Sequence, residues 1–248
     1  MPRLKQIAER MAKSILLART RGLYLSGLLR YLPILRFIAS QRPATILDVG
    51  SGLHGIAPFV HASRVTVQDV SFPPNVRSHA DFVVTGSMTN LPFSNNSYDL
   101  VVSCHAMEHI PDKLRQLALA EMVRVGKRWI VLSCPTGRDA EQADVELADW
   151  FRRRGEAIPG WLDDHLRFGL PDLLTLTESC DCKKQIIYNI SIELNNAMAR
   201  LESVRLFQIL SGIGARVGPQ FGTFLLNRIF SGERHYDAVL IMSKNNSS

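Results

Sequence analysis

The stretch ILDVGSGLHG, residues 46–55, constrains the fold of this chain more than any other part of its sequence. An apolar run leads into it, and three glycines follow, namely Gly50, Gly52 and Gly55. Glycine adopts positive φ without steric cost, so this spacing is typical of a tight turn whose backbone a ligand can approach. Apolar residues continue beyond the turn and predict a helix over residues 55–62. The stretch therefore predicts a strand, a ligand-binding turn and a helix in succession.

Apolar runs and helical patterns alternate along the rest of the chain. The predicted strands cover residues 44–49, 64–70, 81–84, 98–104, 128–134, 184–194 and 235–242. A helix is predicted over residues 113–125, and two helices over 195–233 with a break between Gly212 and Gly218. Strands separated by helices favour a largely parallel sheet covered on both faces, so the chain is predicted to be an α/β protein.

Positive charge is concentrated at the N-terminus. The formal net charge is +6, but residues 1–43 hold nine Lys or Arg against one acid, which leaves −2 for residues 44–248. We expect a basic helical extension over residues 1–43 and a single domain over 44–248. Residues 135–175 carry Pro, Gly and charge clusters that suit a substrate-facing excursion, so insertions in the domain are expected at 136–180 and 195–233.

Cysteine usage and hydrophobicity indicate the cellular context. The four cysteines are too sparse for a disulfide scaffold, and Cys180 and Cys182 lack the paired spacing of a zinc site. We therefore predict buried thiols in a reducing compartment and no metal site. No apolar run approaches the ~20 residues of a membrane-spanning helix, and no signal peptide is evident, so a cytoplasmic protein is expected.

The nature of the ligand depends on Asp48. The Gly-x-Gly-x-x-Gly spacing by itself also fits dinucleotide-binding domains, whose turn and helix N-terminus hold a pyrophosphate. An acid two residues before the first glycine would place negative charge close to that dianion, whereas it would attract an ammonium or sulfonium group. Asp48 could alternatively serve only to cap the turn that follows. The charge argument favours a cationic ligand.

Four stretches follow one another over residues 44–135. They are ILDVGSGLHG, VTVQDVSFP, GSMTNLPFSNNSYDLVVSCHAMEHIPD and ALAEMVRVGKRWIVLSCP. Together they resemble the class I S-adenosylmethionine (SAM) dependent methyltransferases, specifically the methyltransferase type 11 branch related to ubiquinone and menaquinone biosynthesis. The resemblance implies a Rossmann-like seven-stranded sheet with an antiparallel last strand, SAM as cofactor, and methyl transfer that leaves S-adenosylhomocysteine (SAH).

The same resemblance assigns residues to the cofactor. Asp48 and the glycine turn would bind the methionine end, and Asp69 at the end of the second strand would accept both ribose hydroxyls. The loop GSMTNLPF would frame the adenine, anchored by Leu91 and Phe93. The implied cofactor-binding residues are Asp48, Gly50, Ser51, Gly52, Asp69, Val70, Ser87, Met88 and Cys104.

The chain departs from the family pattern at two of these places. His54 stands where many relatives have a glycine, and it puts a side chain at the mouth of the turn. Ser87 stands where many relatives have an acid, and the change removes an acceptor for the adenine. Ser87 is therefore either a ligand or only a loop hydroxyl.

Two histidines are predicted to line the acceptor site. His105 follows the fourth strand, and His165 lies in the stretch GWLDDHLRFGLP. Methyl transfer is an in-line displacement that depends mainly on alignment and desolvation, so a base is needed only if the acceptor must lose a proton early. Glu108 and His109 are interpreted as residues that position their loop. An N-cap formed by Asp163 is the structural alternative for the second stretch.

Apolar stripes between basic residues mark the N-terminal arm and residues 195–233. Such stripes usually pack against a sheet or a second subunit, as in a homodimer, and the alternative is a basic amphipathic lid in peripheral contact with a membrane. The predicted acceptor is a small-molecule or lipid-linked metabolite, and the few aromatics in the arm disfavour a nucleic acid. A NAD-type Rossmann oxidoreductase and a catalytically silent methyltransferase-like scaffold remain alternative functions.

Overall fold

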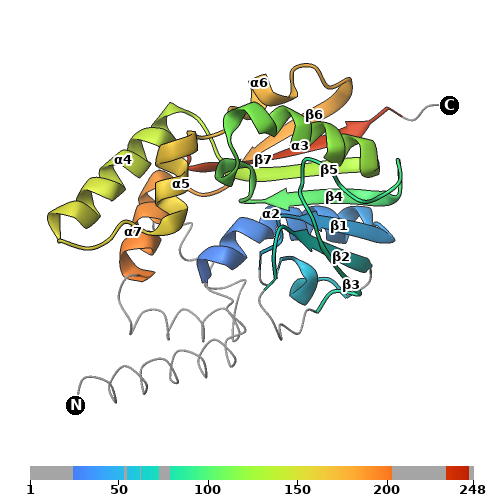
Figure 1. Ribbon diagram of the computed structural model, residues 1–248, viewed down its shortest axis with the longest axis horizontal. Coiled ribbons are helices and arrows are strands. Elements are labelled where there is room, and N and C mark those ends of the chain that lie inside the picture. Colours follow the sequence, from blue (N-terminus) through green and yellow to red (C-terminus); the bar gives the residue numbers. More distant parts are fainter. Residues whose placement is uncertain (1–24, 53–54, 62, 73–78, 203–232, 246–248) are drawn as a thin grey trace, which may run out of the picture.

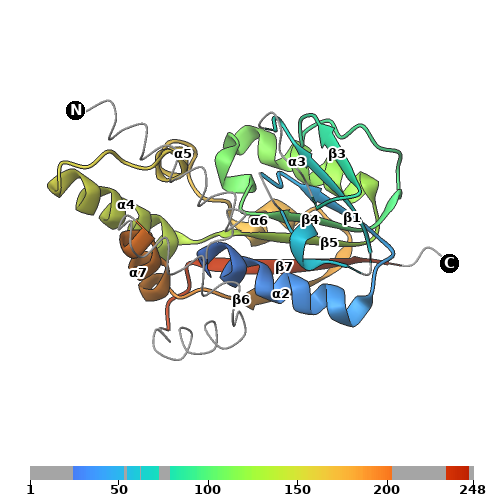
Figure 2. The same ribbon diagram turned by 90° about the horizontal axis from the view of Figure 1, so that it is seen from below.

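The computed structural model describes residues 25–52, 55–61, 63–72, 79–202 and 233–245. Helices cover both faces of one central sheet (Figure 1 and Figure 2). The strands are β1 Thr45–Val49, β2 Arg64–Asp69, β3 Phe82–Thr85, β4 Tyr98–Cys104, β5 Gly126–Pro135, β6 Cys182–Tyr188 and β7 Asp237–Lys244. The helices are α2 Leu25–Gln41, η1 Ala57–Phe59, η2 Met107–His109, α3 Asp112–Val125, α4 Arg138–Arg153, α5 Gly160–Phe168, α6 Leu173–Thr177 and α7 Ile192–Glu202, of which η1 and η2 are 3₁₀ helices.

The strands form one seven-stranded sheet in the order β3-β2-β1-β4-β5-β7-β6. Strand β1 pairs in parallel with β2 and β4, and β4 pairs in parallel with β5. Strand β7 runs antiparallel to both of its neighbours, β5 and β6. The predicted α/β class with an antiparallel last strand is therefore confirmed. The carboxyl ends of β1, β2 and β4 meet at one edge, where open α/β sheets bind their ligands.

The central strands are buried on both faces, which explains their nearly continuous apolar sequences. Neighbouring side chains of one strand enter opposite core clusters, since Leu100 packs on the side of α2 and Val101 on the side of α3. The cluster beside α3 includes Leu47, Leu119, Met122, Leu132 and Leu240. The cluster beside α2 includes Ile34, Ile38, Ile46, Val131 and Val239. The sheet is thereby held between two helical layers.

Helix α2 belongs to the basic N-terminal arm and is a component of the core. Ile34 and Ile38 are buried against the sheet, and Phe37 meets Trp129 of β5 edge-on with ring centroids 5.8 Å apart. The apolar stripe of this part of the arm therefore packs within the protein. The arm before Leu25 lies outside the described residues.

A proline inside α2 is compensated by a distant side chain. Pro33 has no N–H to donate to the carbonyl of the residue four positions earlier, Leu29. Asn189, which follows β6, donates from its Nδ2 to Leu29 O at 3.1 Å. The hydrogen bond thus satisfies the carbonyl and joins the N-terminal arm to the last third of the chain.

The helix predicted over residues 55–62 is wrong in length. Only the short η1 forms, and Val60 after it is extended, with φ of −114° and ψ of 118°. Strand β2 then begins at Arg64. Among the described residues between β1 and β2, η1 is the helix that forms.

The strand predicted over residues 184–194 is too long, because β6 ends at Tyr188 and α7 follows. Ile190 N donates to the side chain of Asp237 at 2.7 Å, and this bond turns the chain out of the sheet. Apolar residues beyond it, such as Leu194, are buried as one face of α7. The alternating apolar pattern of residues 184–194 thus runs past the end of β6, which a tertiary contact sets.

The insertion predicted at residues 136–180 is helical, since it forms α4, α5 and α6. Helices α4 and α5 share a small core of their own, formed by Leu147, Ala148, Phe151 and Leu162. Figure 1 shows them gathered with α7 beyond the carboxyl edge of the parallel strands. The insertion is therefore a packed layer that faces the ligand edge of the sheet.

Two further sequence predictions meet the limits of the described chain. Within the described ranges, no helix combines the length and apolar character needed to cross a membrane. The second helix predicted before residue 233 falls on residues 203–232, which lie outside the described ones. The domain boundary at residue 43 stays a prediction.

Candidate active site

The glycine turn lies between the carboxyl end of β1 and η1. Gly50, Gly52 and Gly55 have φ of 68°, 58° and 52°, values that favour glycine. A Cβ on Gly50 would overlap that of Ala106, and one on Gly55 would overlap the carboxylate of Asp48. At Gly52 no described residue lies within 4 Å of such an atom. The backbone is therefore accessible to a ligand at Gly52.

Asp48 is buried beneath this turn, with 1% of its surface exposed. Ile56 N donates to its Oδ2 at 2.8 Å, so the capping contact considered from the sequence is present. Burial raises the pKa of Asp48 to about 7, with the Ile56 hydrogen bond lowering it and the charge of Asp69 raising it. A cation bound beside Asp48 would favour its ionised form. Capping and ligand binding are compatible, because a carboxylate has several acceptor positions.

Asp69 ends β2 and reaches the same turn. Its Oδ2 accepts from Gly52 N and its Oδ1 from Val70 N, each at 2.7 Å. These bonds orient both oxygens, and each oxygen can still accept from a further donor such as a ribose hydroxyl. Val70 exposes 69% of its surface beside the acid, whereas Ser51 is buried in the turn. The structure therefore brings these predicted cofactor residues together.

The predicted adenine loop follows β3. Ser87 is exposed, with its Oγ 2.8 Å from Thr89 Oγ1, while Met88 is buried in the core. Leu91 is also buried, and Phe93 packs against the same core cluster. The hydroxyl of Ser87 thus takes part in its own loop, and Met88 offers a ligand its backbone rather than its side chain.

Two residues of α3 that sequence analysis did not select hold this loop. Glu121 Oε2 accepts from Leu91 N at 2.7 Å, and Arg124 donates to Leu91 O at 2.9 Å and to Phe93 O at 2.7 Å. The two side chains also form an ion pair with each other at 2.7 Å. Their spacing on one helix face was a visible signal, but it does not reveal loop partners about 30 residues earlier.

His105 follows β4 in a left-handed conformation, with φ of 54°. This conformation is costly for residues other than glycine, and such strain gathers at functional sites. The ring is 9% exposed, with Nδ1 3.1 Å from Glu108 Oε1 and Nε2 3.2 Å from Asp237 Oδ2. Proton transfer to an acceptor would require one of these contacts to open. The preceding Cys104 is buried, and burial raises the pKa of its thiol well above the usual value.

His165 of α5 reaches the same cluster from a distant part of the chain. Its Nδ1 lies 2.9 Å from Asp144 Oδ2 of α4, and Tyr236 OH donates to Asp144 Oδ1 at 2.6 Å. Its other ring nitrogen, Nε2, lies 4.0 Å from Glu108 Oε1. The structure thus brings both predicted catalytic histidines to one glutamate, and their role toward an acceptor stays a prediction.

Glu108, at the centre of this cluster, is fully buried. Burial alone would raise the pKa of its carboxyl, but His105, His109 and His165 together hold that pKa below its usual value. The histidine contacts thus favour the ionised form of Glu108, against the effect of its burial. The cluster residues that sequence analysis did not select are Asp144, Asp164, Tyr236 and Asp237. They come from α4, α5 and the start of β7, and no sequence pattern joins them.

Arg115 of α3 joins the two elements that carry the cluster. It is 2% exposed, and its Nε donates to Met107 O of η2 at 3.1 Å. Its Nη2 donates to Phe168 O at 3.1 Å and to Gly169 O, both at the end of α5. A buried guanidinium thereby fixes the loop of Glu108 relative to the helix of His165.

Two other sequence expectations concern neighbouring positions. The N-cap considered at Asp163 is wrong, because α5 begins at Gly160 with Pro159 as its N-cap, and Asp163 lies inside the first turn. Pro159 has φ of −59° and ψ of 142°, an extended entry that places the start of the helix there. His54 lies outside the described residues.

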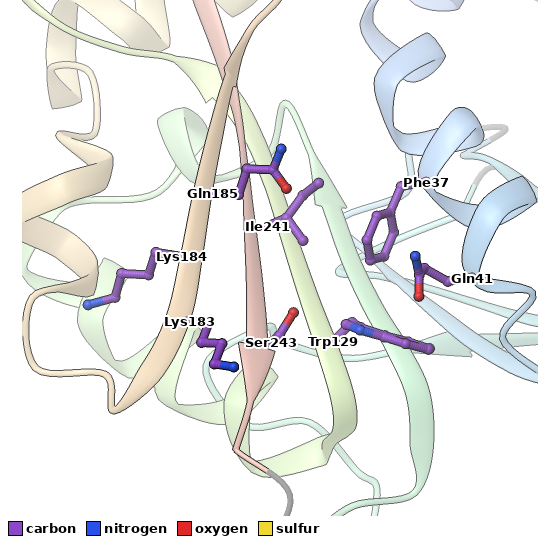
Figure 3. Close-up of a pocket in the computed structure, with 8 residues that line it drawn as sticks. All are labelled: Phe37, Gln41, Trp129, Lys183, Lys184, Gln185, Ile241 and Ser243. Carbon is purple, nitrogen blue, oxygen red and sulfur yellow. The ribbon is translucent and has the colours of Figure 1, made fainter.

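A separate pocket of about 260 Å³ lies between α2 and the sheet. Figure 3 shows Phe37 and Gln41 of α2 facing Trp129 and Ile241 across it. The remaining lining residues are Lys183, Lys184, Gln185 and Ser243. Trp129 lies in the amino-terminal part of β5, so this pocket is at the opposite end of the parallel strands from the glycine turn. It is not part of the candidate active site.

Comparison with known sequences identifies the same region of the chain. Residues 47–129 match the family described as Methyltransferase domain. Over 143 residues the chain is 28% identical to ajmaline N-methyltransferase from Rauvolfia serpentina, an alignment that covers 49% of this chain and 47% of that protein. The chain therefore spans about half the length of this curated relative.

Solved structures share the fold. A candidate sarcosine dimethylglycine methyltransferase from Galdieria sulphuraria has a TM-score of 0.52 at 17% identity, covering 87% of this chain and 86% of that one. Phosphoethanolamine N-methyltransferase 2 of Haemonchus contortus, solved in complex with SAM, has a TM-score of 0.50 at 15% identity, covering 93% of this chain and 59% of that one. Residues 47–129 therefore match a methyltransferase domain, and the chain shares the fold of these solved structures.

Proposed function

We propose that the chain transfers a methyl group from SAM to a small-molecule or lipid-linked acceptor. The observation that carries the proposal is the pair of acids at the glycine turn. Asp48 is buried beneath the turn, and Asp69 bonds to its backbone at Gly52, where the turn is open. Two carboxylates around an accessible backbone suit a ligand with a cationic amino-acid end and a ribose diol.

A NAD-type oxidoreductase fits these features less well. Dinucleotide-binding sheets have the order 3-2-1-4-5-6, whereas here β7 enters antiparallel between β5 and β6. An ionised Asp48 beneath the turn would also repel a pyrophosphate held there. Both points favour SAM over a dinucleotide.

The chain would contribute binding, orientation and exclusion of water. The residues proposed to hold the cofactor are Asp48, Gly50, Ser51, Gly52, Asp69, Val70, Ser87, Met88 and Cys104. SAM, when bound, supplies a methyl group on a sulfonium centre that a nucleophile displaces in line, a reaction that depends on alignment. His105 follows β4, and His165 lies on α5 at the same edge of the sheet. We propose that both histidines line the acceptor side.

A thermal unfolding series tests the cofactor. SAH at about 100 times its dissociation constant is expected to stabilise the chain by about 2.7 kcal/mol, which raises Tm by about 5–10 °C. Asp69→Asn is expected to lose most of this rise, because it removes an oxygen anion from the ribose site. The matched control is Asp149→Asn on α4, which changes a half-exposed acid paired with Arg152 and keeps the full rise. Stabilisation by NAD with none by SAH would overturn the proposal.

The acceptor belongs to the proposal as well. The names of two relatives, ajmaline N-methyltransferase and phosphoethanolamine N-methyltransferase 2, support a small acceptor. A lipid-linked acceptor of the quinone-related branch would bring the chain to a membrane surface. Flotation with anionic liposomes at low salt distinguishes the two, since a chain that stays unbound excludes the lipid-linked choice. Release of SAH from SAM with a panel of small acceptors separates an enzyme from a silent scaffold.

A further inference from the structure

We propose that Glu108, His109 and His165 form a binding site for a divalent transition-metal cation. One ligand atom from each of these residues lies within 4.8 Å of the others, although the three come from η2 and α5. The spacing of cysteines and histidines in the sequence predicts no such site. The inference goes beyond methyl transfer and rests on the geometry, burial and contacts of these side chains.

Both histidines are oriented as metal ligands usually are. His109 Nδ1 lies 3.1 Å from Asp164 Oδ2, and His165 Nδ1 lies 2.9 Å from Asp144 Oδ2. A metal-binding histidine typically donates its second ring N–H to a carboxylate, which fixes the tautomer and leaves the other nitrogen for the cation. In both residues that remaining nitrogen is Nε2. Tyr236 OH in turn donates to Asp144, so the carboxylate behind His165 is itself held.

The third ligand is a buried carboxylate without a proper hydrogen bond. Both carboxylate oxygens of Glu108 are buried and lack a well-oriented hydrogen-bond donor among the described residues. The nearest groups are His105 Nδ1 at 3.1 Å and His165 Nε2 at 4.0 Å from Oε1. A buried carboxylate normally satisfies its oxygens with donors or coordinates a metal. Because only histidine nitrogens approach Oε1 and no described donor is well oriented toward either oxygen, the carboxylate points to a cationic ligand.

The charge of the surrounding cluster supports a cation. Glu108, Asp144 and Asp237 are all buried, and the ion pairs that they form within the described chain are with histidines. The buried guanidinium of Arg115 donates to backbone carbonyls and pairs with Asp112 rather than with these acids. A dication at Glu108 would offset two negative charges where they are least screened.

The geometry also indicates which kind of cation fits. Metal–nitrogen and metal–oxygen bonds of about 2.0–2.2 Å require ligand atoms about 3–4 Å apart, so the three side chains would close by about 1 Å on binding. Two imidazoles and one carboxylate suit Zn²⁺, Co²⁺, Fe²⁺ or Mn²⁺ better than Ca²⁺ or Mg²⁺. His109 is 32% exposed and gives solvent access, while Glu108 and His165 are buried. Three protein ligands leave a coordination position open, as in catalytic rather than structural sites.

The experiment is a titration of the full-length, metal-stripped chain with Co²⁺, without SAM or acceptor. We expect one equivalent of Co²⁺ to bind, with the d–d absorption bands of nitrogen and oxygen ligands. The absence of a thiolate charge-transfer band would exclude Cys180 and Cys182 as ligands of the ion. Glu108→Gln should weaken binding at least about 100-fold, and Asp164→Asn about 10–100-fold, because it loosens the support of His109. His61→Ala, which removes an exposed histidine outside the cluster, should leave affinity unchanged.

Two results would overturn the proposal. One is the absence of stoichiometric Co²⁺ or Zn²⁺ binding by the native chain, which would leave the cluster as a hydrogen-bonded network of histidines and acids. The other is equal binding by native chain and Glu108→Gln, which would place the cation elsewhere. Should Glu108→Gln fail to fold by circular dichroism, X-ray absorption of the native Zn²⁺ complex decides, since sulfur or only water ligands would contradict the site. SAH stabilisation of the metal-stripped chain is measured separately, so failure of the metal site and failure of methyl transfer are distinguishable.

Discussion

Asp48 combines two requirements that oppose each other. Its side chain is 1% exposed, and burial raises its pKa to about 7, so the folded chain holds a proton that the unfolded chain releases near pH 4. Between these values stability therefore falls as pH rises, and the penalty is complete above about pH 7. The proposed cationic ligand, however, needs the ionised form. The residue is thus a site where binding is favoured at the expense of stability.

The raised pKa of Asp48 predicts how the stability of Asp48→Asn depends on pH. The amide oxygen can still accept from Ile56 N, but the side chain never ionises. The variant should gain stability relative to the native chain by about 1.4 kcal/mol per pH unit between about pH 4 and pH 7, hence about 3 kcal/mol more at pH 8 than at pH 5. Urea unfolding at both pH values measures this difference. Asp149→Asn on α4 serves as the exposed control, and an equal advantage at the two pH values contradicts the interpretation.

If Asp48 contacts the cationic end of SAM, binding of SAM should release protons. A cation beside Asp48 lowers the pKa of its carboxyl from about 7, so part of a proton leaves when SAM binds at neutral pH. Calorimetry in two buffers of different ionisation enthalpy measures the number of protons released. The native chain should release more protons than Asp48→Asn, and the difference between the two isolates Asp48 from the amino group of SAM itself. Equal proton exchange in both would show that Asp48 does not meet the cation.

At the scale of elements, Arg115 is the residue on which the arrangement of the metal cluster depends. Arg115→Met keeps much of the apolar stem but leaves buried carbonyls of Met107 and Phe168 without a donor. We expect a loss of about 2–5 kcal/mol in the free energy of unfolding, since each unsatisfied buried group costs about 1–3 kcal/mol. Chemical denaturation measures it. Arg152→Met on α4, where the arginine is 56% exposed, should change stability by no more than about 0.5 kcal/mol.

The same variant should also weaken Co²⁺ binding, because η2 and α5 carry different ligands of one ion. A native affinity in Arg115→Met would mean that the two elements hold their places without the guanidinium. If Arg115→Met loses both stability and Co²⁺ affinity while Arg152→Met is unaffected, the effect is due to the hydrogen bonds of Arg115 to η2 and the end of α5.

Elements differ in how far sequence alone predicts them. Buried strands such as β4 are continuous apolar runs, and the predicted bounds 98–104 agree with the structure because burial on both faces dictates them. The predictions over 55–62 and 184–194 are wrong where the chain direction depends on tertiary contacts, as with Asp237 beyond β6. The site divides in the same way. Asp48 and Asp69 are predictable from spacing around one turn, whereas the cluster at Glu108 joins residues up to 132 positions apart through packing.

At the scale of the whole molecule, both proposed sites lie at one edge of the sheet, and both ends of the described chain pack against that sheet. Gly50 packs so closely on Ala106 that the cofactor turn and the segment leading to Glu108 share one wall. Helices α2 and α7 share a core cluster that includes Leu29 and Met198, and Asn189, which lies between β6 and α7, bonds to α2. The N-terminal arm and the last third of the chain thus stabilise each other. The basic arm is thereby part of the structure that positions the site.

Deletion of residues 1–43 tests this integration. It removes four buried side chains of α2, Leu28, Leu29, Ile34 and Ile38, each worth about 1.5–3 kcal/mol of burial. Together they contribute about 6–12 kcal/mol, which is comparable with the 5–15 kcal/mol that stabilises a typical domain. The shortened chain should therefore lose near-ultraviolet circular dichroism and bind hydrophobic dyes, although it retains every residue of both proposed sites.

A milder variant calibrates that experiment. Asn189→Ala leaves Leu29 O without its donor but keeps all of α2, and it should lower the free energy of unfolding by about 1–3 kcal/mol while the chain stays folded. Urea unfolding of this variant and size-exclusion chromatography of the deletion give the two measurements. If the deletion instead folds with a native spectrum and binds SAH as the full chain does, residue 43 is a true domain boundary and α2 is an appendage. The buried face of α2, with Phe37 against Trp129, argues for the opposite result.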